Sequence, residues 1–337
     1  MVISQTIQAL TQKENIGYNM AKAAMKEIMD GQASDVQKSA YLTALSMKGE
    51  TIEEITGSAE EMRAHSLAFP YSGECLEIVG TGGDRSNSFN ISTTSSLVIA
   101  AAGVPVAKHG NRAASSKSGA ADCLEALGVK IDLSPEQGAK LLKEHGICFL
   151  FAQKYHTSMK YVGPIRKELG IRTIFNILGP LTNPAHASLQ IMGVYEEALL
   201  TPMAHVLHNL GVTRGLVVYG QERLDEISSC GPTSVCEFDG DAIKEYTIRP
   251  EDFGYTPAAK EELVGGTPEE NAAITLSILK GEGKGSKRNA VCMNAGAALY
   301  VAKKAATIEE GVRLAEQLID SGAALRKLEE FISESNK

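Results

Sequence analysis

Residues 1–70 carry apolar side chains at the spacing of amphipathic helices and little else. Capping boxes at Ser34 with Gln37 and at Thr51 with Glu54 each precede a helical apolar pattern. The pattern therefore predicts a small helical domain over residues 1–70.

From residue 71 onward, short β-rich runs alternate with helical patterns. Residues 76–79 form the first such run, the glycines of residues 80–83 follow, and a helical stretch covers residues 92–102. Repetition of this order predicts a mostly parallel sheet covered by helices. The further strands are expected at residues 104–108, 148–152, 191–194 and 216–219, and further helices at residues 120–127 and 202–210.

The C-terminal part adds a hairpin and long helices. Asp239-Gly240 is a hairpin-turn sequence between β-rich residues 235–238 and 242–248. The predicted fold class is α/β, with a small N-terminal helical domain and a larger α/β domain over residues 71–337 whose mostly parallel central sheet is covered by helices. Three more capping boxes mark helix starts at Ser134 with Gln137, Thr267 with Glu270 and Thr307 with Glu310.

Composition narrows the function classes. The 337 residues include 33 Lys+Arg and 41 Asp+Glu, and the net charge of −8 has the wrong sign for coating nucleic acid or anionic lipid. The six cysteines are scattered without zinc-site spacing, which suits a reduced compartment. Because no secretory signal and no apolar stretch of transmembrane length are visible, we expect a cytoplasmic protein with no nucleic-acid or membrane partner.

A glycine-rich segment, Gly-Thr-Gly-Gly-Asp at residues 80–84, lies between the first expected strand and a helix that begins near Ser92. Three glycines in four positions let the backbone approach a ligand, and the positive end of the helix faces the same space, so the segment suits phosphate. The sequence matches neither the nucleoside-triphosphatase loop nor the dinucleotide-binding fingerprint. The alternative interpretation is a tight turn capped by Ser92.

Two further segments carry candidate chemistry. Residues 108–119 place Lys108, His109 and Arg112 beside small hydroxyl residues directly after a strand, an arrangement that suits phosphate better than a plain surface loop. Asp225 and Glu226 follow the strand expected at residues 216–219, and adjacent carboxylates of this kind suit Mg²⁺ that bridges to substrate phosphates. Arg166 is suited to a substrate carboxylate, with an exposed helical arginine as the alternative.

Together these segments resemble the anthranilate phosphoribosyltransferase family in order and spacing, over essentially the whole chain. The matching motifs are residues 80–84, 90–93, 108–112 and 178–184, with Arg166 and the pair Asp225-Glu226. The resemblance implies transfer of the 5-phosphoribosyl group from 5-phosphoribosyl 1-pyrophosphate to the amine of anthranilate in tryptophan biosynthesis. It also implies Mg²⁺, a homodimer built through the helical domain, and a segment near residues 165–185 that returns to that domain.

The motifs also carry over site residues, one by one. The resemblance implies that anthranilate meets Gly80, Asn111 and Arg166, and that Mg²⁺ is served by Ser92, Asp225 and Glu226. We assign no catalytic residue, because the aromatic amine is neutral and carries a lone pair, so its position against C1 of the ribose matters more than a general base. The residues implied for phosphoribosyl pyrophosphate are Gly80, Gly83, Asp84, Ser88, Asn90, Ile91, Ser92, Thr93, Lys108, His109, Gly110, Asn111, Arg112, Ala113, Ala114, Ser115, Ser116 and Ala120.

The chain departs from the family pattern at Ala120, Tyr219 and Arg223, where Ser, His and Gly are usual. Ala120 removes one hydroxyl from the phosphate shell, although its backbone N–H remains. Three alternatives stay open. The first is a pyrimidine nucleoside phosphorylase, whose Lys-His-Ser-Thr-Gly-Gly pattern is absent here. The second is a relative that binds nucleic acid without catalysis, which would leave the acidic pair Asp225-Glu226 unexplained. The third is a helical scaffold protein, which would leave the glycine-rich and basic segments unexplained.

Overall fold

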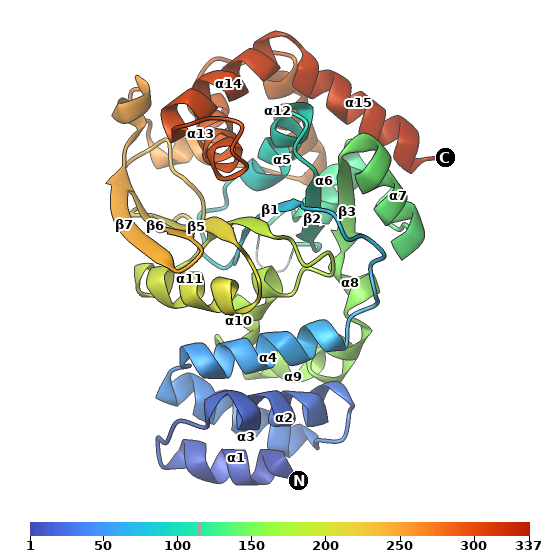
Figure 1. The fold of residues 1–337 in the computed structure, drawn as a ribbon, viewed down its shortest axis with the longest axis vertical. Helices are drawn as coiled ribbons and strands as arrows, with labels where there is room; N and C mark the ends of the chain where they lie inside the picture. Colours follow the sequence, from blue (N-terminus) through green and yellow to red (C-terminus); the bar gives the residue numbers. More distant parts are fainter. Residues whose placement is uncertain (114–115) are drawn as a thin grey trace.

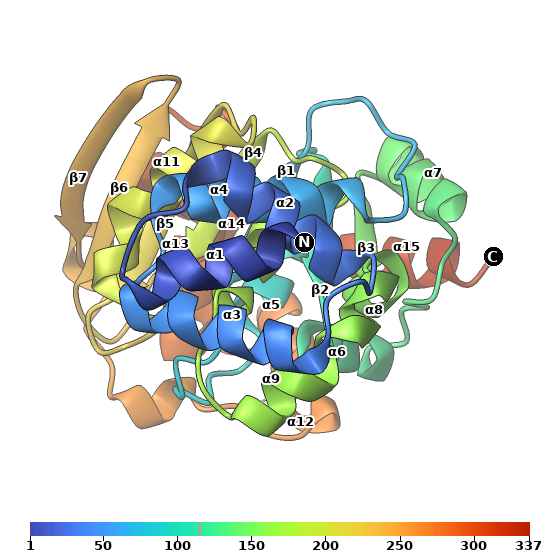
Figure 2. The ribbon, with the colours of Figure 1, turned by 90° about the horizontal axis from the view of Figure 1, so that it is seen from below.

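The computed structural model describes residues 1–113 and 116–337. The chain begins with four helices that pack on one another at one end of the molecule (Figures 1 and 2): α1 (Val2–Thr11), α2 (Gly17–Met29), α3 (Asp35–Lys48) and α4 (Ile52–Ala64). Ile3, Tyr41 and Leu42 are fully buried in their shared core. The capping boxes predicted at Ser34 and Thr51 are confirmed at the starts of α3 and α4.

A later segment of the chain returns to these helices. Val162 and Ile165 are buried in the same hydrophobic cluster as the N-terminal helices. Ser46 of α3 donates a hydrogen bond to the Arg172 carbonyl at 3.0 Å. In Figure 1 this segment lies beside α4 and below the sheet, and its elements are η1 (Thr157–Tyr161), α9 (Gly163–Leu169), α10 (Phe175–Leu178) and η2 (Gly179–Leu181).

One seven-stranded sheet forms the centre of the molecule, in the order β3-β2-β1-β4-β5-β6-β7. Its first five positions are parallel, and β6 and β7 extend it as an antiparallel hairpin. Gly80 and Gly193 are paired at the carboxyl ends of β1 and β4. The strands are β1 (Leu76–Gly80), β2 (Val106–Gly110), β3 (Ile147–Phe151), β4 (Leu189–Gly193), β5 (Arg214–Gly220), β6 (Thr233–Asp239) and β7 (Ala242–Ile248).

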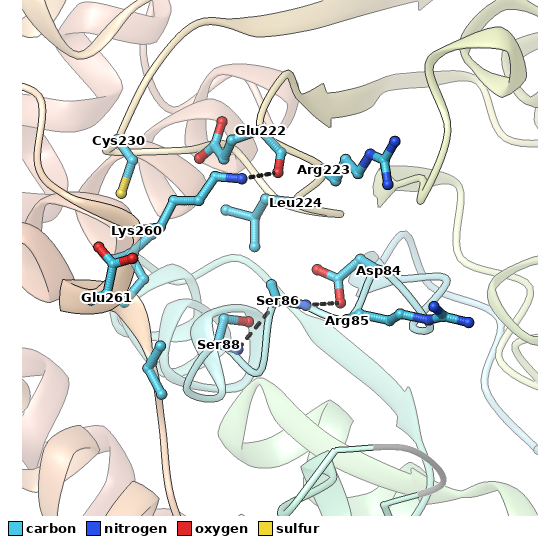
Figure 3. Close-up of a pocket in the computed structure, with 12 residues that line it drawn as sticks. Asp84, Arg85, Ser86, Ser88, Glu222, Arg223, Leu224, Cys230, Lys260 and Glu261 are labelled. Atoms are coloured by element: carbon cyan, nitrogen blue, oxygen red, sulfur yellow. Dashed lines mark hydrogen bonds between the residues drawn. The ribbon is translucent and has the colours of Figure 1, made fainter.

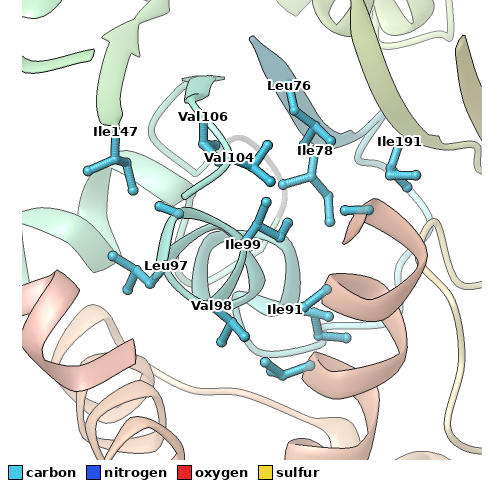
Figure 4. Close-up of a cluster of buried hydrophobic side chains, with 14 of the residues drawn as sticks. Leu76, Ile78, Ile91, Leu97, Val98, Ile99, Val104, Val106, Ile147 and Ile191 are labelled. Carbon is cyan, nitrogen blue, oxygen red and sulfur yellow. The ribbon is translucent and has the colours of Figure 1, made fainter. Parts of the chain in front are cut away.

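Helices cover both faces of the sheet. Figure 1 shows α5 (Ile91–Ala101) with the C-terminal helices on one side, and α11 (Leu200–Asn209) with the N-terminal helices on the other. Apolar side chains of α5, such as Leu97 and Ile99, pack in the large core cluster with Ile78 and Ile191 of the sheet (Figure 4). The other helices are α6 (Ala120–Ala126), α7 (Pro135–His145), α8 (Ala152–Tyr155), α12 (Pro268–Leu279), α13 (Ser286–Val301), α14 (Ile308–Asp320) and α15 (Ala323–Ser335), with short turns η3 (Glu197–Leu199), η4 (Pro250–Phe253) and η5 (Lys260–Leu263).

The α/β class with a small helical part and a mostly parallel sheet is confirmed, with local differences. β2 begins after Pro105, which lacks the amide hydrogen that a strand residue donates. At Thr307 only half of the capping box forms, because the Glu310 carboxylate accepts its hydrogen bond from the Ala306 amide instead of that of Thr307. Within the described residues, no helix combines the length and apolar character needed to cross a bilayer.

Candidate active site

The centre of the candidate site is the place where Asp225 lies over the paired glycines of β1 and β4. The Gly82 amide donates a hydrogen bond to the Asp225 carboxylate at 2.6 Å. A Cβ added to Gly80 would overlap the same carboxylate, and a Cβ added to Gly193 would overlap the Asp225 carbonyl oxygen. The two glycines therefore provide the space in which the acidic pair lies against residues 80–90, the loop between β1 and α5 that is called the glycine loop below.

Three acids crowd this position. Asp225 and Glu226 are each 8% exposed, and the Asp225 amide lies 3.4 Å from the Asp84 carboxylate. Burial raises the pKa of Glu226 to about 7, and burial together with the Asp84 charge raises the pKa of Asp225 well above its usual range. Buried carboxylates that repel one another are stabilised by a cation placed between them.

Lys108 faces this acidic group from β2. Its ammonium donates to the Ile78 carbonyl at 2.8 Å and to the Ser92 hydroxyl at 3.3 Å, while the Ser92 amide donates to Glu226 at 3.2 Å. Burial lowers the pKa of Lys108, and the charges of Glu77 and Glu226 oppose that shift. Lys108, Ser92 and Glu226 thus form one connected group at the start of α5.

A second layer of buried polar groups supports β2. Glu77 on β1 accepts from the His109 amide at 2.9 Å and from the Asn183 side chain, which also donates to the Ala107 carbonyl at 2.8 Å. Burial raises the pKa of Glu77 to about 7. Asn183 belongs to the motif of residues 178–184, so the structure gives that motif a defined position behind Lys108 and His109.

The glycine loop continues into α5. Gly83 has a positive φ of 73°, and its carbonyl accepts from the Arg172 guanidinium at 2.7 Å. Thr93 is 1% exposed, as is Ile91, whose side chain points into the core (Figure 4). Both residues lie in the first turn of α5, where a helix offers its backbone N–H groups to a phosphate.

The basic loop, residues 108–119, is held by acidic side chains of α6. Arg112 pairs with Asp122 at 3.0 Å and with Glu125, and its guanidinium stacks over the Phe151 ring. The Asp122 carboxylate also accepts from the amides of Ala113 and Gly119, next to Ala120 at the start of α6. Arg112 is therefore engaged away from the acidic pair.

The rest of the loop is described except at its tip. Gly110 ends β2, and Asn111 and Ser116 are exposed. Ser116 Oγ lies 3.3 Å from the Ser118 carbonyl. Ala114 and Ser115 lie outside the described residues.

His109 near the end of β2, His156 just before η1 and Arg166 on α9 are the remaining candidate groups on the side of the returning segment. His109 and His156 are buried with ring centroids 5.1 Å apart, and burial lowers the pKa of His156 to about 4. Arg166 is half-buried over the Phe175 ring, at 5.3 Å from guanidinium to centroid. In the described parts of the chain no hydrogen bond joins Arg166 to Gly80 or Asn111, and Asn111 Oδ1 accepts from the Arg112 amide at 2.8 Å and from the Gln153 side chain at 3.2 Å.

Sequence reasoning missed His156, which follows β3 through α8, whereas His109 is the next-to-last residue of β2. A histidine just beyond the carboxyl end of a parallel strand was the available signal. It also missed Glu77, which is a polar residue inside an otherwise apolar strand. A buried acid in such a strand requires partners, and this requirement was the available signal.

A cavity of about 400 Å³ opens beside the glycine loop (Figure 3). Asp84 and Ser88 line it from the predicted set, and Ser88 pairs with Val264 across it as an isolated β-bridge. Arg223 has a positive φ of 74°, the conformation that the glycine usual in the family adopts freely. The other lining residues are Arg85, Ser86, Glu222, Leu224, Cys230, Lys260, Glu261 and Leu263.

The donor set fits Mg²⁺ of the kind that is shared with a substrate. The described residues hold no cluster of three His, Cys, Asp or Glu side chains ready to bind a metal by themselves. Mg²⁺ commonly takes only one or two carboxylates from the protein and completes its shell with waters and substrate phosphates. The crowded pair Asp225 and Glu226, beside the Ser92 hydroxyl, provides that number of oxygens.

Comparison with known proteins identifies the family of the chain. Residues 4–66 match the helical bundle domain of a glycosyl transferase family, and residues 72–325 match its a/b domain. The anthranilate phosphoribosyltransferase of Methanobrevibacter smithii is 62% identical over 335 residues, covering 99% of this chain and 100% of that protein. The chain belongs to the anthranilate phosphoribosyltransferase family.

Solved structures of family members share the whole fold. Anthranilate phosphoribosyltransferase from Thermus thermophilus is 43% identical, with a TM-score of 0.93 over 98% of this chain and 99% of that chain. The enzyme from Saccharomyces cerevisiae in complex with PRPP and Mg is 29% identical, with a TM-score of 0.92 over 99% of this chain and 98% of that chain.

Proposed function

We propose that the chain transfers the 5-phosphoribosyl group from 5-phosphoribosyl 1-pyrophosphate to the amine of anthranilate, giving N-(5-phosphoribosyl)anthranilate and pyrophosphate. The observation that carries this proposal is the meeting of the glycine loop with Asp225, Glu226 and Lys108 at the carboxyl edge of the sheet. Backbone amides, a buried ammonium and an acidic pair together suit a polyphosphate that arrives with a divalent cation.

The phosphoribosyl pyrophosphate lies, in this proposal, along the glycine loop and the start of α5. Of the residues carried over by motif, Gly83, Asp84, Ser88 and Asn90 belong to the loop, and Ile91, Ser92 and Thr93 to the first turn of α5. Residues 108–113, Ser116 and Ala120 close the other side from β2 and α6, and Ala114 and Ser115 belong to the same predicted set. Because Arg112 is paired with Asp122 and Glu125, its contact with phosphate requires the guanidinium to leave those acids.

Anthranilate is assigned to the side of the returning segment, at Gly80, Asn111 and Arg166. Burial lowers the pKa of both His109 and His156, and this buried, neutral pair makes this side less polar than the phosphate side, which suits an aromatic ring. Burial lowers the pKa of Arg166, which nevertheless remains cationic and suited to a carboxylate.

Mg²⁺ is assigned to Asp225, Glu226 and Ser92, in line with the Mg in the structure of the yeast relative. When bound, the ion offsets the negative charge of the departing pyrophosphate. The chain's own part is to hold two carboxylates and one hydroxyl beside the glycine loop, with Lys108 adding a positive charge on the same side.

The reaction needs position more than proton transfer. The bond from C1 of the ribose to pyrophosphate breaks with its electron pair on the pyrophosphate oxygen, and positive charge develops on the sugar. The amine nitrogen of anthranilate forms the new bond to C1 and loses one proton, which passes to the departing pyrophosphate or to water. Its lone pair is already available at neutral pH, so the chain's task is to hold nitrogen and C1 in contact and to stabilise the leaving group.

The proposal is tested by following the fluorescence of anthranilate in the presence of Mg²⁺ and phosphoribosyl pyrophosphate, which the absence of tryptophan from the chain makes simple. We expect fluorescence loss only when all three components are present. Asp225→Asn with Glu226→Gln should abolish turnover while the fold survives. Unchanged turnover of this variant at limiting Mg²⁺ contradicts the metal assignment. The proposed reaction is contradicted if the protein leaves anthranilate unchanged and instead cleaves pyrimidine nucleosides in the presence of phosphate.

We also propose that residues 1–70, joined by the returning segment near residues 165–185, form one small helical domain beside the α/β domain of residues 71–337, and that two copies associate through that helical domain. The shared core of the N-terminal helices with Val162 and Ile165 supports the first proposal. The exposed apolar side chains of Val36 and Met47 on α3 support the second.

A further inference from the structure

Asn271 lies in the first turn of α12, and its side chain is only 1% exposed. Its amide contacts the glycine-loop side of the site. The Asn271 Nδ2 group donates to Asn90 Oδ1 at 2.8 Å, and Asn271 Oδ1 accepts from the Gly266 amide at 2.8 Å. A buried side chain that is 181 residues further along the chain therefore forms a hydrogen bond to Asn90, which is predicted to bind phosphate.

The orientation of both amides follows from backbone groups whose roles are fixed. The Gly266 N–H can only donate, so the Asn271 atom facing it is oxygen and the group facing Asn90 is the NH₂. Ser118 continues the network from the basic loop: its hydroxyl donates to Asn90 Oδ1 at 3.1 Å, and its carbonyl accepts from Asn90 Nδ2 at 3.3 Å. Both ends of the network thus require the Asn90 oxygen to face Asn271.

This arrangement leaves a donor for the substrate. The Asn90 NH₂ group has two hydrogens, and among the described residues its one acceptor is the Ser118 carbonyl. The second N–H is available beside the N-terminus of α5, where a phosphate is favoured by the helix end. If the amide were reversed, Asn90 would present a carbonyl oxygen, which repels phosphate.

The segment before α12 is tied to the same loop. The Phe89 amide donates to the Leu263 carbonyl at 2.9 Å, and the Gly265 amide donates to the Asn87 carbonyl at 2.9 Å. The end of the glycine loop and the start of α12 are therefore one hydrogen-bonded unit, and Asn271 holds a fixed place relative to Asn90.

We propose that Asn271 is a positioning residue for the phosphoribosyl pyrophosphate site: it holds the Asn90 amide with its N–H toward a substrate phosphate and its oxygen away. This inference rests on the proposed function, because it assigns Asn90 a phosphorylated substrate. Asn271 does not touch the substrate and acts through Asn90 and Ser118.

The near-isosteric variant Asn271→Asp tests the inference. Its carboxylate still accepts from the Gly266 amide but cannot donate to Asn90, so the Asn90 amide turns its NH₂ toward residue 271 and its oxygen toward the phosphate. We expect the KM for phosphoribosyl pyrophosphate to rise about tenfold, as for loss of a hydrogen bond to a charged group, with the KM for anthranilate unchanged. Asn271→Ala separates this effect from the added charge and should raise the same KM.

Inhibition by the two phosphorylated halves of the substrate gives a second measurement. Inhibition by inorganic pyrophosphate and by ribose 5-phosphate is compared in the wild type and both variants. We expect the inhibition constant of the one whose phosphate meets Asn90 to rise by the same factor as the KM, while the other changes little. If the inhibition constants of both anions are the same in the variants as in the wild type, the inference is overturned.

Thr275→Val is the matched control. Thr275 lies one turn further along α12, is fully buried, and joins its hydroxyl to that of Thr94 in α5 at 2.8 Å. We expect this variant to lower the Tm and leave every KM unchanged. If the Asn271 variants behave in the same way, with a lower Tm and an unchanged KM, then Asn271 is only structural and the inference is wrong.

The wild type decides separately on the proposed function. If it consumes anthranilate and Asn271→Asp retains the wild-type KM, the inference fails and the function stands. If the wild type is inactive, the proposed function fails, and titration calorimetry of phosphoribosyl pyrophosphate with the wild type and Asn271→Asp still tests the inference, since equal affinities overturn it.

Discussion

At the scale of single residues, the site depends on groups whose partners are distant in sequence. Gly80 stands out in the sequence because it belongs to a glycine cluster, whereas Gly193 ends an ordinary strand. Only the pairing of β1 with β4, and Asp225 lying over both glycines, shows that both must lack a Cβ. A one-residue motif of this kind is invisible until the strand order is known.

His156 allows a prediction on pH. Burial lowers its pKa to about 4, so the ring is neutral in the folded protein, whereas in the unfolded chain it titrates near 6.5. Between these values the unfolded state binds a proton that the folded state does not, so stability is complete above pH 6.5 and falls as the pH is lowered. We expect this group to cost about 2 kcal/mol in the free energy of unfolding between pH 7.5 and 4.5.

Urea denaturation of the wild type and of His156→Gln at several pH values checks this prediction. Glutamine keeps a neutral polar side chain of similar size but does not titrate, so the advantage of the wild type should shrink steadily below pH 6.5. Parallel stability curves for the two proteins over this range would show that His156 is not kept neutral by the fold.

At the scale of elements, the returning segment reaches the glycine loop through one side chain. The Arg172 guanidinium stacks on the Tyr195 ring at 3.9 Å and donates to the Gly83 carbonyl at 2.7 Å. The Arg172 carbonyl accepts from Ser46 of α3. The position of the N-terminal helices is thereby coupled to the loop that is proposed to hold phosphate.

Arg172→Lys should raise the KM for phosphoribosyl pyrophosphate about two- to fivefold with little change in Tm. An exposed stacked cation and one hydrogen bond contribute about 1 kcal/mol, and lysine cannot keep both the planar stack and the bond to Gly83. Tyr195→Phe keeps the ring and serves as the control, with wild-type kinetics expected. Steady-state kinetics that are identical for wild type and Arg172→Lys would rule out this coupling.

The sequence predicts elements better than it predicts their contacts. Strands, helices and most capping boxes follow from local patterns, and the acidic pair, the glycine loop and Lys108 follow from motifs. Arg112 shows where such prediction fails. Its position in the loop predicts a phosphate ligand, whereas in the fold it forms ion pairs with Asp122 and Glu125 of α6. Asn271 shows another limit, since a single polar residue in a helical pattern does not reveal which loop it will meet.

At the scale of the whole molecule, the N-terminal helices lie at the end remote from the C-terminal helices (Figure 1), and Asp225, Glu226 and Lys108 meet at the carboxyl ends of the strands and not on the N-terminal helices. Association through these helices would therefore leave both sites complete. Val36 and Met47, 79% and 80% exposed on α3, are the apolar side chains most open to water there. Burial of these two side chains against a second copy would remove their apolar surface from water.

We expect Val36→Asp with Met47→Lys to separate a dimer of two 35.9 kDa chains into monomers. Both substitutions suit the helix, with an acid in the first turn and a base in the last, so α3 should persist while its apolar contact is lost. Light scattering after size-exclusion chromatography measures the mass, with Lys244→Asp on exposed β7 as the charge-changing control. Because each chain holds its own site, turnover per chain should be retained; a variant that stays dimeric would place the interface elsewhere.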